Sequence, residues 1–206
     1  MRAEPRSDGP DSPRLRLATP DDAAAIAQIY APWVSESAVS FEAEPPSAAA
    51  LAVRIASVSR CYPWLVLEFN GAVRAYAYAT RLRDRQAYDW IAETSVYVDR
   101  SIQRRGLGER VYSALLDVLA MQGLVWAYAA IVVASEAVSE GASGRFHAQL
   151  GFERFARFPG VGFKQGNWWD VEWWRLALAE PGEPEAIRPI HDIRLREAIA
   201  ERLAWP

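Results

Sequence analysis

The sequence contains few of the residues that build metal and redox sites: its 206 residues include one cysteine, Cys61, and two histidines. One cysteine excludes an internal disulfide and a cysteine-based zinc site, and it is typical of a reducing compartment. We expect Cys61 to be a small, buried apolar side chain and expect no bound metal. No apolar run approaches the roughly 20 residues that span a bilayer, and the first residues lack the apolar core of a secretory signal. These absences predict a cytoplasmic protein with no membrane partner.

The sequence also lacks a large excess of charge of either sign. The formal net charge is only −3, and lysine and arginine are scattered along the chain, so no broad basic face for nucleic acid is predicted. The 51% hydrophobic content supports one sizeable core, and the length suits one domain with tails rather than two domains.

Three segments are predicted from composition. Residues 1–13 are rich in Pro, Asp, Ser and Arg and are expected to be a disordered tail. Residues 14–180 form the domain. Residues 181–206 begin with a Pro-Gly-Glu-Pro linker and continue with a possible amphipathic helix within 190–203, which either packs on the domain or a partner or frays.

Periodicity and turn signals predict a mixed α/β chain of the α+β type. The expected strands are 15–18, 64–69, 73–80, 88–98, 125–133, one after 152 and 168–178, and the expected helices are 23–30, 48–59, 109–122 and 144–150. Asn70-Gly71 is a strong signal for a tight hairpin between two of these strands. A helix connecting 88–98 to 125–133 makes these two strands parallel.

A glycine-containing loop precedes the helix 109–122 and is a candidate phosphate site. Gly106 and Gly108 let a ligand approach the main chain, helix-terminal N–H groups favour anions, and Arg104 and Arg105 add positive charge. The spacing fits neither a P-loop nor a dinucleotide fingerprint, which needs a small residue where Val111 stands. Without further evidence, a tight strand-to-helix connection explains this loop equally well.

Gln103-Arg104-Arg105-Gly106-Leu107-Gly108 resembles the pyrophosphate loop of the GNAT N-acetyltransferases. Other stretches resemble the phosphinothricin N-acetyltransferase group, whose members act on small amino-acid-like amines such as methionine sulfoximine or methionine sulfone. These stretches are Tyr62-Pro63-Trp64-Leu65-Val66, Ala87-Tyr88-Asp89-Trp90 with Glu93 and Val96-Tyr97-Val98, and Gly162-Phe163-Lys164-x-Gly166-x-Trp168-x-Asp170-Val171. The resemblance covers about residues 15–178. It implies a GNAT fold, with a mostly antiparallel sheet, flanking helices and one splayed parallel strand pair at the acetyl-CoA site, and a homodimer.

The resemblance also implies a set of acetyl-CoA contacts. Strand residues would pair with the pantetheine arm like an added strand, and the glycine loop would wrap the pyrophosphate. The implied residues are Val96, Tyr97, Val98, Gln103, Arg104, Arg105, Gly106, Leu107, Gly108, Glu109 and Ser143.

Two residues are candidates for proton transfer. A protonated amine cannot attack a thioester, so the reaction needs a base, and the resemblance places Glu93 near the substrate amine. His147 occupies the position of the residue that protonates the departing CoA thiolate in related enzymes, and a histidine titrates near working pH. The alternatives are an exposed strand carboxylate for Glu93 and a structural helix histidine for His147. A backbone N–H near Tyr97 or Val98 is the candidate for holding the oxyanion.

Acidic groups of a substrate call for cationic side chains, and Arg83, Arg85 and Lys164 are the candidates, each equally compatible with a solvated surface charge. The tryptophans could wall the pocket, although packing is the expected role for Trp90, Trp168, Trp169, Trp173 and Trp174.

The chain departs from the family pattern before His147. The family has an asparagine where Glu140, or Glu136 in another register with Ser139, stands here, and the segment is longer. Three other functions therefore stay open. They are acetylation of another amine (a polyamine, an antibiotic or a protein N-terminus), acetyl-CoA binding with little catalysis, and a C-terminal region devoted mainly to self-association.

Overall fold

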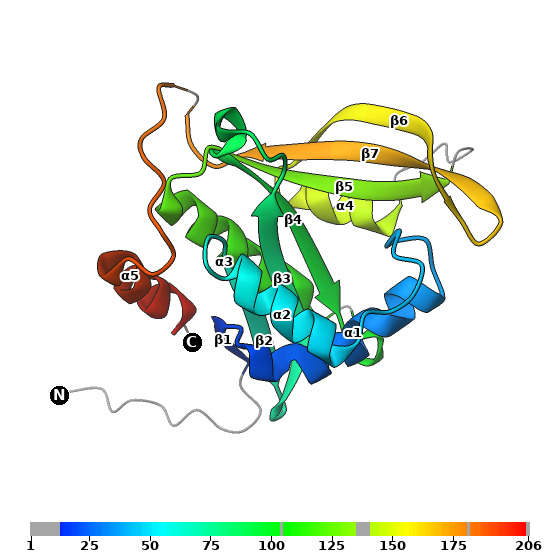
Figure 1. Cartoon of the computed structure of the whole chain (residues 1–206), viewed down its shortest axis with the longest axis horizontal. Coiled ribbons are helices and arrows are strands. Elements are labelled where there is room, and N and C mark those ends of the chain that lie inside the picture. Colours follow the sequence, from blue (N-terminus) through cyan, green and yellow to red (C-terminus); the bar gives the residue numbers. More distant parts are fainter. Residues whose placement is uncertain (1–12, 104, 135–140, 181, 205–206) are drawn as a thin grey trace.

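The computed structural model describes residues 13–103, 105–134, 141–180 and 182–204, which form a twisted sheet between two layers of helices (Figure 1). Most of the predicted tail, 1–12, lies outside these residues. The strands are β1 Arg14–Leu17, β2 Trp64–Phe69, β3 Ala72–Arg81, β4 Ile91–Val98, β5 Trp126–Ala134, β6 Glu153–Lys164 and β7 Asn167–Ala177. The α-helices are α1 Ala23–Ser35, α2 Ala48–Val58, α3 Leu107–Gln122, α4 Ala142–Gln149 and α5 Ile193–Leu203.

The sheet order is β1-β2-β3-β4-β5-β7-β6, and every neighbouring pair is antiparallel except β4 and β5, which are parallel. The predicted hairpin between β2 and β3 turns at Asn70 and Gly71, both at positive φ. β4 pairs with β5 only from Ile91 to Glu93, and the two strands then diverge, as Figure 1 shows. The predicted fold class, with its splayed parallel pair, is confirmed.

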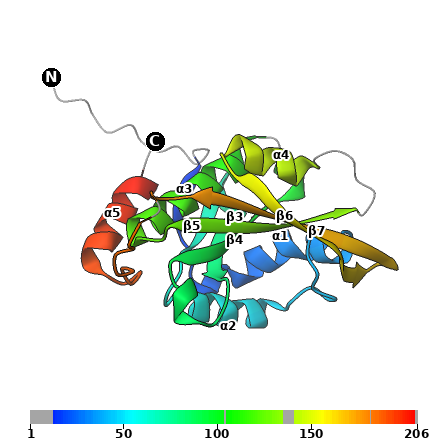
Figure 2. The ribbon, with the colours of Figure 1, turned by 90° about the horizontal axis from the view of Figure 1, so that it is seen from above.

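The two faces of the sheet are covered by different helices (Figure 2). α1 and α2 pack on one face around Trp64, Val66 and Tyr76, and α3 packs on the other around Leu65, Ala77 and neighbouring residues. Consecutive side chains of a strand point to opposite faces, so the nearly continuous apolar run of β2 supplies both cores.

The helix predicted within 190–203 is α5, and it packs on the domain rather than fraying. Leu195, Ile199 and Leu203 are buried in the core cluster that contains α3. An ion pair between Arg202 and Asp117 links the two helices, with Arg202 Nε 2.7 Å from the carboxylate. The C-terminal segment therefore completes the core on the α3 side.

Two local predictions are wrong. Cys61 is exposed, because it lies in the turn after α2, where its N–H donates to Val58 O and its own carbonyl accepts from Gln122. The strand expected to start at Tyr88 starts at Ile91, because residues 86–88 form a 3₁₀ turn in which Asp89 N–H donates to Gln86 O.

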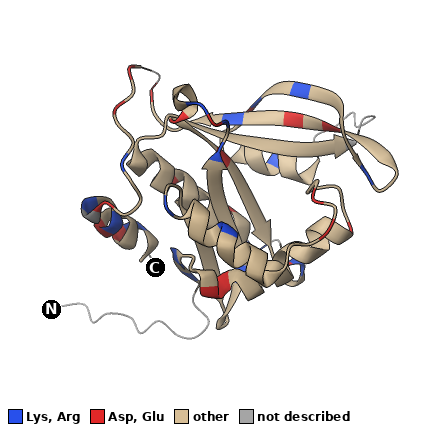
Figure 3. Ribbon diagram, in the orientation of Figure 1, with Lys and Arg blue, Asp and Glu red and all other residues tan. Residues whose placement is uncertain are grey.

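Charged residues of both signs are interspersed over the described residues, and Figure 3 shows both signs together on β7 and on α5. Within the described ranges, no helix is both long and apolar enough to cross a membrane.

Candidate active site

The opening between β4 and β5 exposes backbone groups of β4. Asp99 N–H donates to Arg74 O in the direction of β3, and Val125 N–H donates to Trp90 O from the opposite side. Because the hydrogen-bonding direction alternates along a strand, Val96 and Val98 direct their N–H and C=O groups toward the opening. The Val98 carbonyl already accepts a hydrogen bond of 3.3 Å from Trp33 Nε1. Tyr97 directs its own toward β3, with which it pairs, so its N–H is not available to an oxyanion.

The predicted pyrophosphate loop leads directly into α3. Gly106 has φ +74° as the residue before the helix, a conformation that side chains other than glycine rarely adopt. A Cβ added to Gly108 would lie 3.1 Å from the Val98 side chain, so this glycine allows α3 to start close against β4. Gln103, Arg105 and Glu109 are exposed around the helix start, and Arg104 lies outside the described residues. Free N–H groups at the start of a 16-residue helix, two glycines and exposed polar side chains suit a pyrophosphate.

Glu93 is the last residue of β4 that pairs with β5, opposite Tyr128. Its side chain is half-buried, and burial raises the pKa of this carboxyl, while the positive charge of Arg83 opposes the rise. A carboxylate with a raised pKa at the start of the strand opening is a better base than an ordinary glutamate.

His147 is buried on α4 at 5% exposure. Its Nδ1 lies 2.8 Å from Ser143 O, and its Nε2 lies 3.3 Å from the Tyr112 hydroxyl. Burial lowers the pKa of His147, and the Ser143 carbonyl opposes that effect. Both ring nitrogens therefore face groups inside the protein.

Glu93 and His147 lie on opposite faces of the sheet. Thr94, the residue after Glu93, points toward α3 and contacts Tyr112, so Glu93 points toward the α1 and α2 side. The structure thus places both predicted residues near the strand opening without bringing their side chains together.

The three predicted substrate cations have different surroundings. Arg83 and Arg85 are exposed in the loop between β3 and β4, and Arg83 is close enough to Glu93 to influence its charge. Lys164 is already engaged: its ammonium donates to Val34 O at 2.7 Å and Ser40 O at 2.6 Å. Lys164 therefore ties the end of α1 and the following loop to the β6–β7 hairpin.

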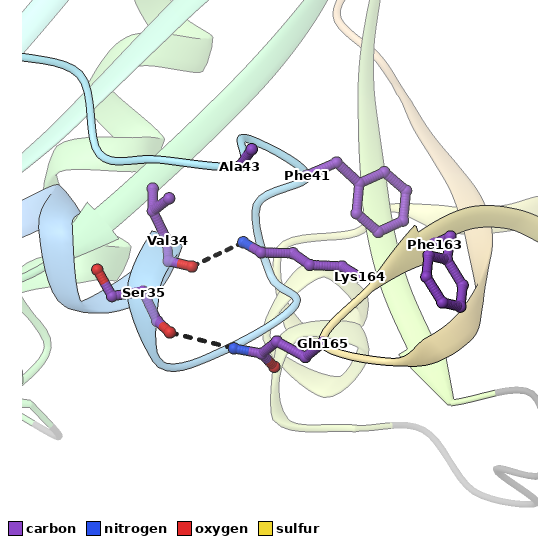
Figure 4. Close-up of a pocket in the computed structure, with 7 residues that line it drawn as sticks. All are labelled: Val34, Ser35, Phe41, Ala43, Phe163, Lys164 and Gln165. Atoms are coloured by element: carbon purple, nitrogen blue, oxygen red, sulfur yellow. Dashed lines mark hydrogen bonds between the residues drawn. The ribbon is translucent and has the colours of Figure 1, made fainter.

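A cavity of about 340 Å³ lies beside this lysine. Its wall combines the end of α1, the following loop and the β6–β7 turn, and Figure 4 shows Lys164 and Gln165 reaching across to the backbone of Val34 and Ser35. Phe41 closes another side against Gly162, where an added Cβ would lie 2.3 Å from the aromatic ring.

Aromatic side chains surround Tyr97 on the Glu93 face of β4, and these neighbours were not predicted from the sequence. Tyr97 packs against Tyr30, Trp33 and Tyr76, with ring centroids 4.8, 6.4 and 5.3 Å away, and burial raises the pKa of Tyr78 to about 12. The alternation of tyrosines along β3 is the sequence feature that could have indicated this aromatic face.

The tryptophans divide between packing and exposure. Trp174 is buried in the core, whereas Trp168 is 61% exposed and contacts Phe163 at the β6–β7 turn. Trp169 and Trp90 each donate a hydrogen bond to a backbone carbonyl, of Lys164 and Glu185 respectively. Packing in the core therefore does not describe Trp168, and packing at an interface stays a prediction for this residue.

Ser143 is exposed on the first turn of α4, where its carbonyl holds His147. The residues on which the family departure rests, Glu136, Ser139 and Glu140, lie outside the described residues.

Comparisons with known proteins agree with this geometry. Residues 15–173 match the family model described as Acetyltransferase (GNAT) domain. The chain is 35% identical over 179 residues to a phosphinothricin N-acetyltransferase of Streptomyces viridochromogenes, covering 87% of this chain and 95% of that protein. It is 34% identical over 173 residues to an L-methionine sulfoximine/L-methionine sulfone acetyltransferase of Salmonella typhimurium, covering 84% of this chain and 98% of that protein.

A solved structure shares the fold. It is a GNAT superfamily phosphinothricin acetyltransferase from Sinorhizobium meliloti in complex with AcCoA, with a TM-score of 0.78, 30% sequence identity, and coverage of 87% of this chain and 97% of that chain. The divergent parallel strands, the glycine loop before α3 and these relatives lead to one conclusion: the chain belongs to the GNAT acetyltransferase family.

Proposed function

We propose that this protein transfers the acetyl group of acetyl-CoA to the amine of a small amino-acid-like substrate, of the phosphinothricin, methionine sulfoximine or methionine sulfone type. The observation that carries the proposal is the half-buried Glu93, with its raised pKa, at the point where β4 and β5 separate. The relatives named for these substrates support the choice of acceptor.

Acetyl-CoA would occupy the strand opening and the start of α3. The backbone groups of Val96 and the N–H of Val98 are oriented to pair with an extended ligand, whereas the Val98 carbonyl already accepts from Trp33 Nε1. N–H groups after Gly106 are available to a pyrophosphate. The Val98 N–H is our candidate for stabilising the oxyanion that forms on the acetyl carbonyl.

Glu93, directly or through water, would take the first proton from the substrate ammonium so that the neutral amine can attack the thioester. The acetyl group passes directly to the amine and CoA leaves as the thiol, a reaction for which we propose no metal. Arg83 and Arg85 are candidates for holding a carboxylate or phosphinate of the acceptor. Lys164 would shape the acceptor side by holding the loop after α1.

The test is release of CoA thiol from acetyl-CoA with the three named acceptors and a panel of unrelated amines. We expect turnover with at least one named acceptor, and a loss of about 10²-fold or more in Glu93→Gln, the range expected for removing a general base. The matched control is Glu197→Gln, which neutralises an exposed carboxylate on α5. Turnover only with a polyamine, antibiotic or peptide amine would contradict the acceptor class. Binding of acetyl-CoA without turnover on any amine would contradict catalysis.

The partner in solution is proposed to be a second copy of this chain. Strand β6 is an edge of the sheet, and large apolar side chains are exposed along β6, its turn and the start of β7: Phe155, Phe158, Val161, Phe163 and Trp168. Apolar side chains on an open edge strand favour association.

A cytoplasmic location completes the proposal, supported by the single cysteine.

A further inference from the structure

A chain of hydrogen bonds runs from His147 to the point where β4 and β5 separate. His147 Nε2 lies 3.3 Å from Tyr112 Oη, Tyr112 Oη lies 2.6 Å from Thr94 Oγ1, and the Thr94 hydroxyl donates to Tyr128 O at 2.9 Å. Tyr128 is the last residue of β5 that pairs with β4. The three side chains are at most 5% exposed, so within the described residues these contacts link the His147 ring to the opening.

This series of hydrogen bonds has three contacts but only two protons to fill them. Nδ1 of His147 faces the Ser143 carbonyl, which only accepts, so Nδ1 carries the ring proton. Burial lowers the pKa of His147, so the ring is neutral at working pH and Nε2 holds a lone pair. The hydroxyl protons of Tyr112 and Thr94 must then serve three contacts. One of the three contacts therefore always lacks a proton, and rotation of the two hydroxyl groups changes which contact this is.

Among the residues that the structure describes, the His147 ring contacts one titratable side chain, Tyr112 from α3. Its other aromatic contacts are Phe146 and Phe152. Thr94, from β4, is reached only through Tyr112.

We propose that Thr94 and Tyr112 form a relay through which His147 accepts, and then returns, the second proton of the acetyl transfer. The inference rests on the proposed function. After the amine attacks, its nitrogen carries one proton too many. That proton passes to Thr94 Oγ1 as the Thr94 proton passes to Tyr112 Oη and the Tyr112 proton passes to His147 Nε2. The reverse sequence delivers a proton to the departing thiolate, so the relay ends in its starting state.

The proposal also accounts for the placement of the two predicted residues on opposite faces of the sheet. Glu93 removes the first proton from the α1 and α2 side, and His147 handles the second from the α3 side. Each group meets the same opening without touching the other.

The first experiment reads the proton on His147 directly by ¹⁵N NMR of the imidazole rings. The chain has only two histidines, so His191→Gln identifies the His147 signals. We expect the neutral ring to be the Nδ1–H tautomer, with a titration midpoint below the ordinary 6.5. An Nε2–H tautomer would overturn the proposal, because each of the three hydrogen bonds would then have its proton and Nε2 could accept none.

The second experiment is kinetic. We expect Tyr112→Phe and Thr94→Val to lower kcat by about 10²-fold, the lower range for proton-transfer groups, with the KM for acetyl-CoA unchanged. Thr94→Ser should restore the rate, and Tyr112→Phe added to His147→Ala should cost no further loss, because the residues act as one unit. Tyr62→Phe, which removes a hydroxyl at the edge of the same core cluster, is the matched control.

Additive losses, or equal rates for the serine and valine variants, would overturn the relay. The NMR experiment needs no acceptor. If no amine is acetylated, the proposed function fails, and the NMR experiment still shows which ring nitrogen of His147 carries the proton.

Discussion

Among single residues, Arg83 acts on the proposed base, Glu93. Burial raises the pKa of Glu93, and the positive charge of Arg83 opposes that rise. As the proposed base, Glu93 would work in its charged form, so we expect activity to fall as the pH drops through this pKa. In Arg83→Gln the lowering charge is gone, and the acidic limb of kcat should move to higher pH. Arg85→Gln is the comparison, and an unmoved limb in Arg83→Gln would show that the two side chains do not interact.

Candidate site residues were predictable where chemistry leaves few choices, and their roles stay predictions. Glu93 and His147 were named through a family resemblance, and the glycines of the loop through their spacing. Thr94 and Tyr112 were missed because each fits an apolar pattern, Thr94 by strand alternation and Tyr112 by the helical stripe of α3. A tyrosine in a buried stripe needs a hydrogen-bond partner, and that was the available signal. Cys61 shows the reverse error, because a residue type that is often buried lies in a turn.

Lys164 connects two elements that are far apart in the sequence. Its ammonium holds Val34 O and Ser40 O, and Ser40 in turn shares a 2.6 Å hydrogen bond with Tyr30, which packs on Tyr97 of β4. Lys164→Met should therefore loosen the loop after α1. We expect a higher KM for the acceptor, an unchanged KM for acetyl-CoA and a loss of about 1–3 kcal/mol in unfolding free energy.

Kinetics with each substrate varied in turn, together with denaturant unfolding, measure these effects. Gln165→Ala, which removes only one hydrogen bond to Ser35 O, is the milder control. A matching rise in the KM for acetyl-CoA would contradict a role confined to the acceptor side.

Elements with strong local signals were predicted within a few residues: α2, α3 and the hairpin of β2 and β3. α3 begins at Leu107, two residues before its predicted start, because Gly106 already takes the left-handed conformation. α1 continues to Ser35, past its predicted end and through Pro32. Its last turn is held by tertiary contacts from Lys164 and Gln165, which local propensity cannot reveal.

At the scale of the whole molecule, α5 belongs to the core although the family match ends at residue 173. Leu195 is 1% exposed against the α3 side, so Leu195→Ala should lower the unfolding free energy by about 2–5 kcal/mol. Glu197→Ala, exposed on the same helix, should change it by less than about 0.5 kcal/mol. Equal midpoints in denaturant for the two variants would contradict a structural role for α5.

Self-association through β6 is testable by light scattering coupled to size-exclusion chromatography. We expect the wild type to run as a dimer, and Phe158→Lys to shift it toward monomer by placing a charge among the exposed apolar side chains. Arg188→Glu, on the exposed segment before α5, is the control. A dimer that survives Phe158→Lys would place the interface elsewhere.

The two edges of the sheet differ. β6 has 12 residues, whereas β1 has four and lies beside α5. A sheet with two long free edges can add copies at both ends without limit, which is the geometry of a fibre. Here only one edge is long enough to recruit a partner, and when two such edges meet around a twofold axis, neither is left over. For the proposed association through β6, the unequal edges therefore predict a closed dimer rather than a filament, although apolar side chains are exposed.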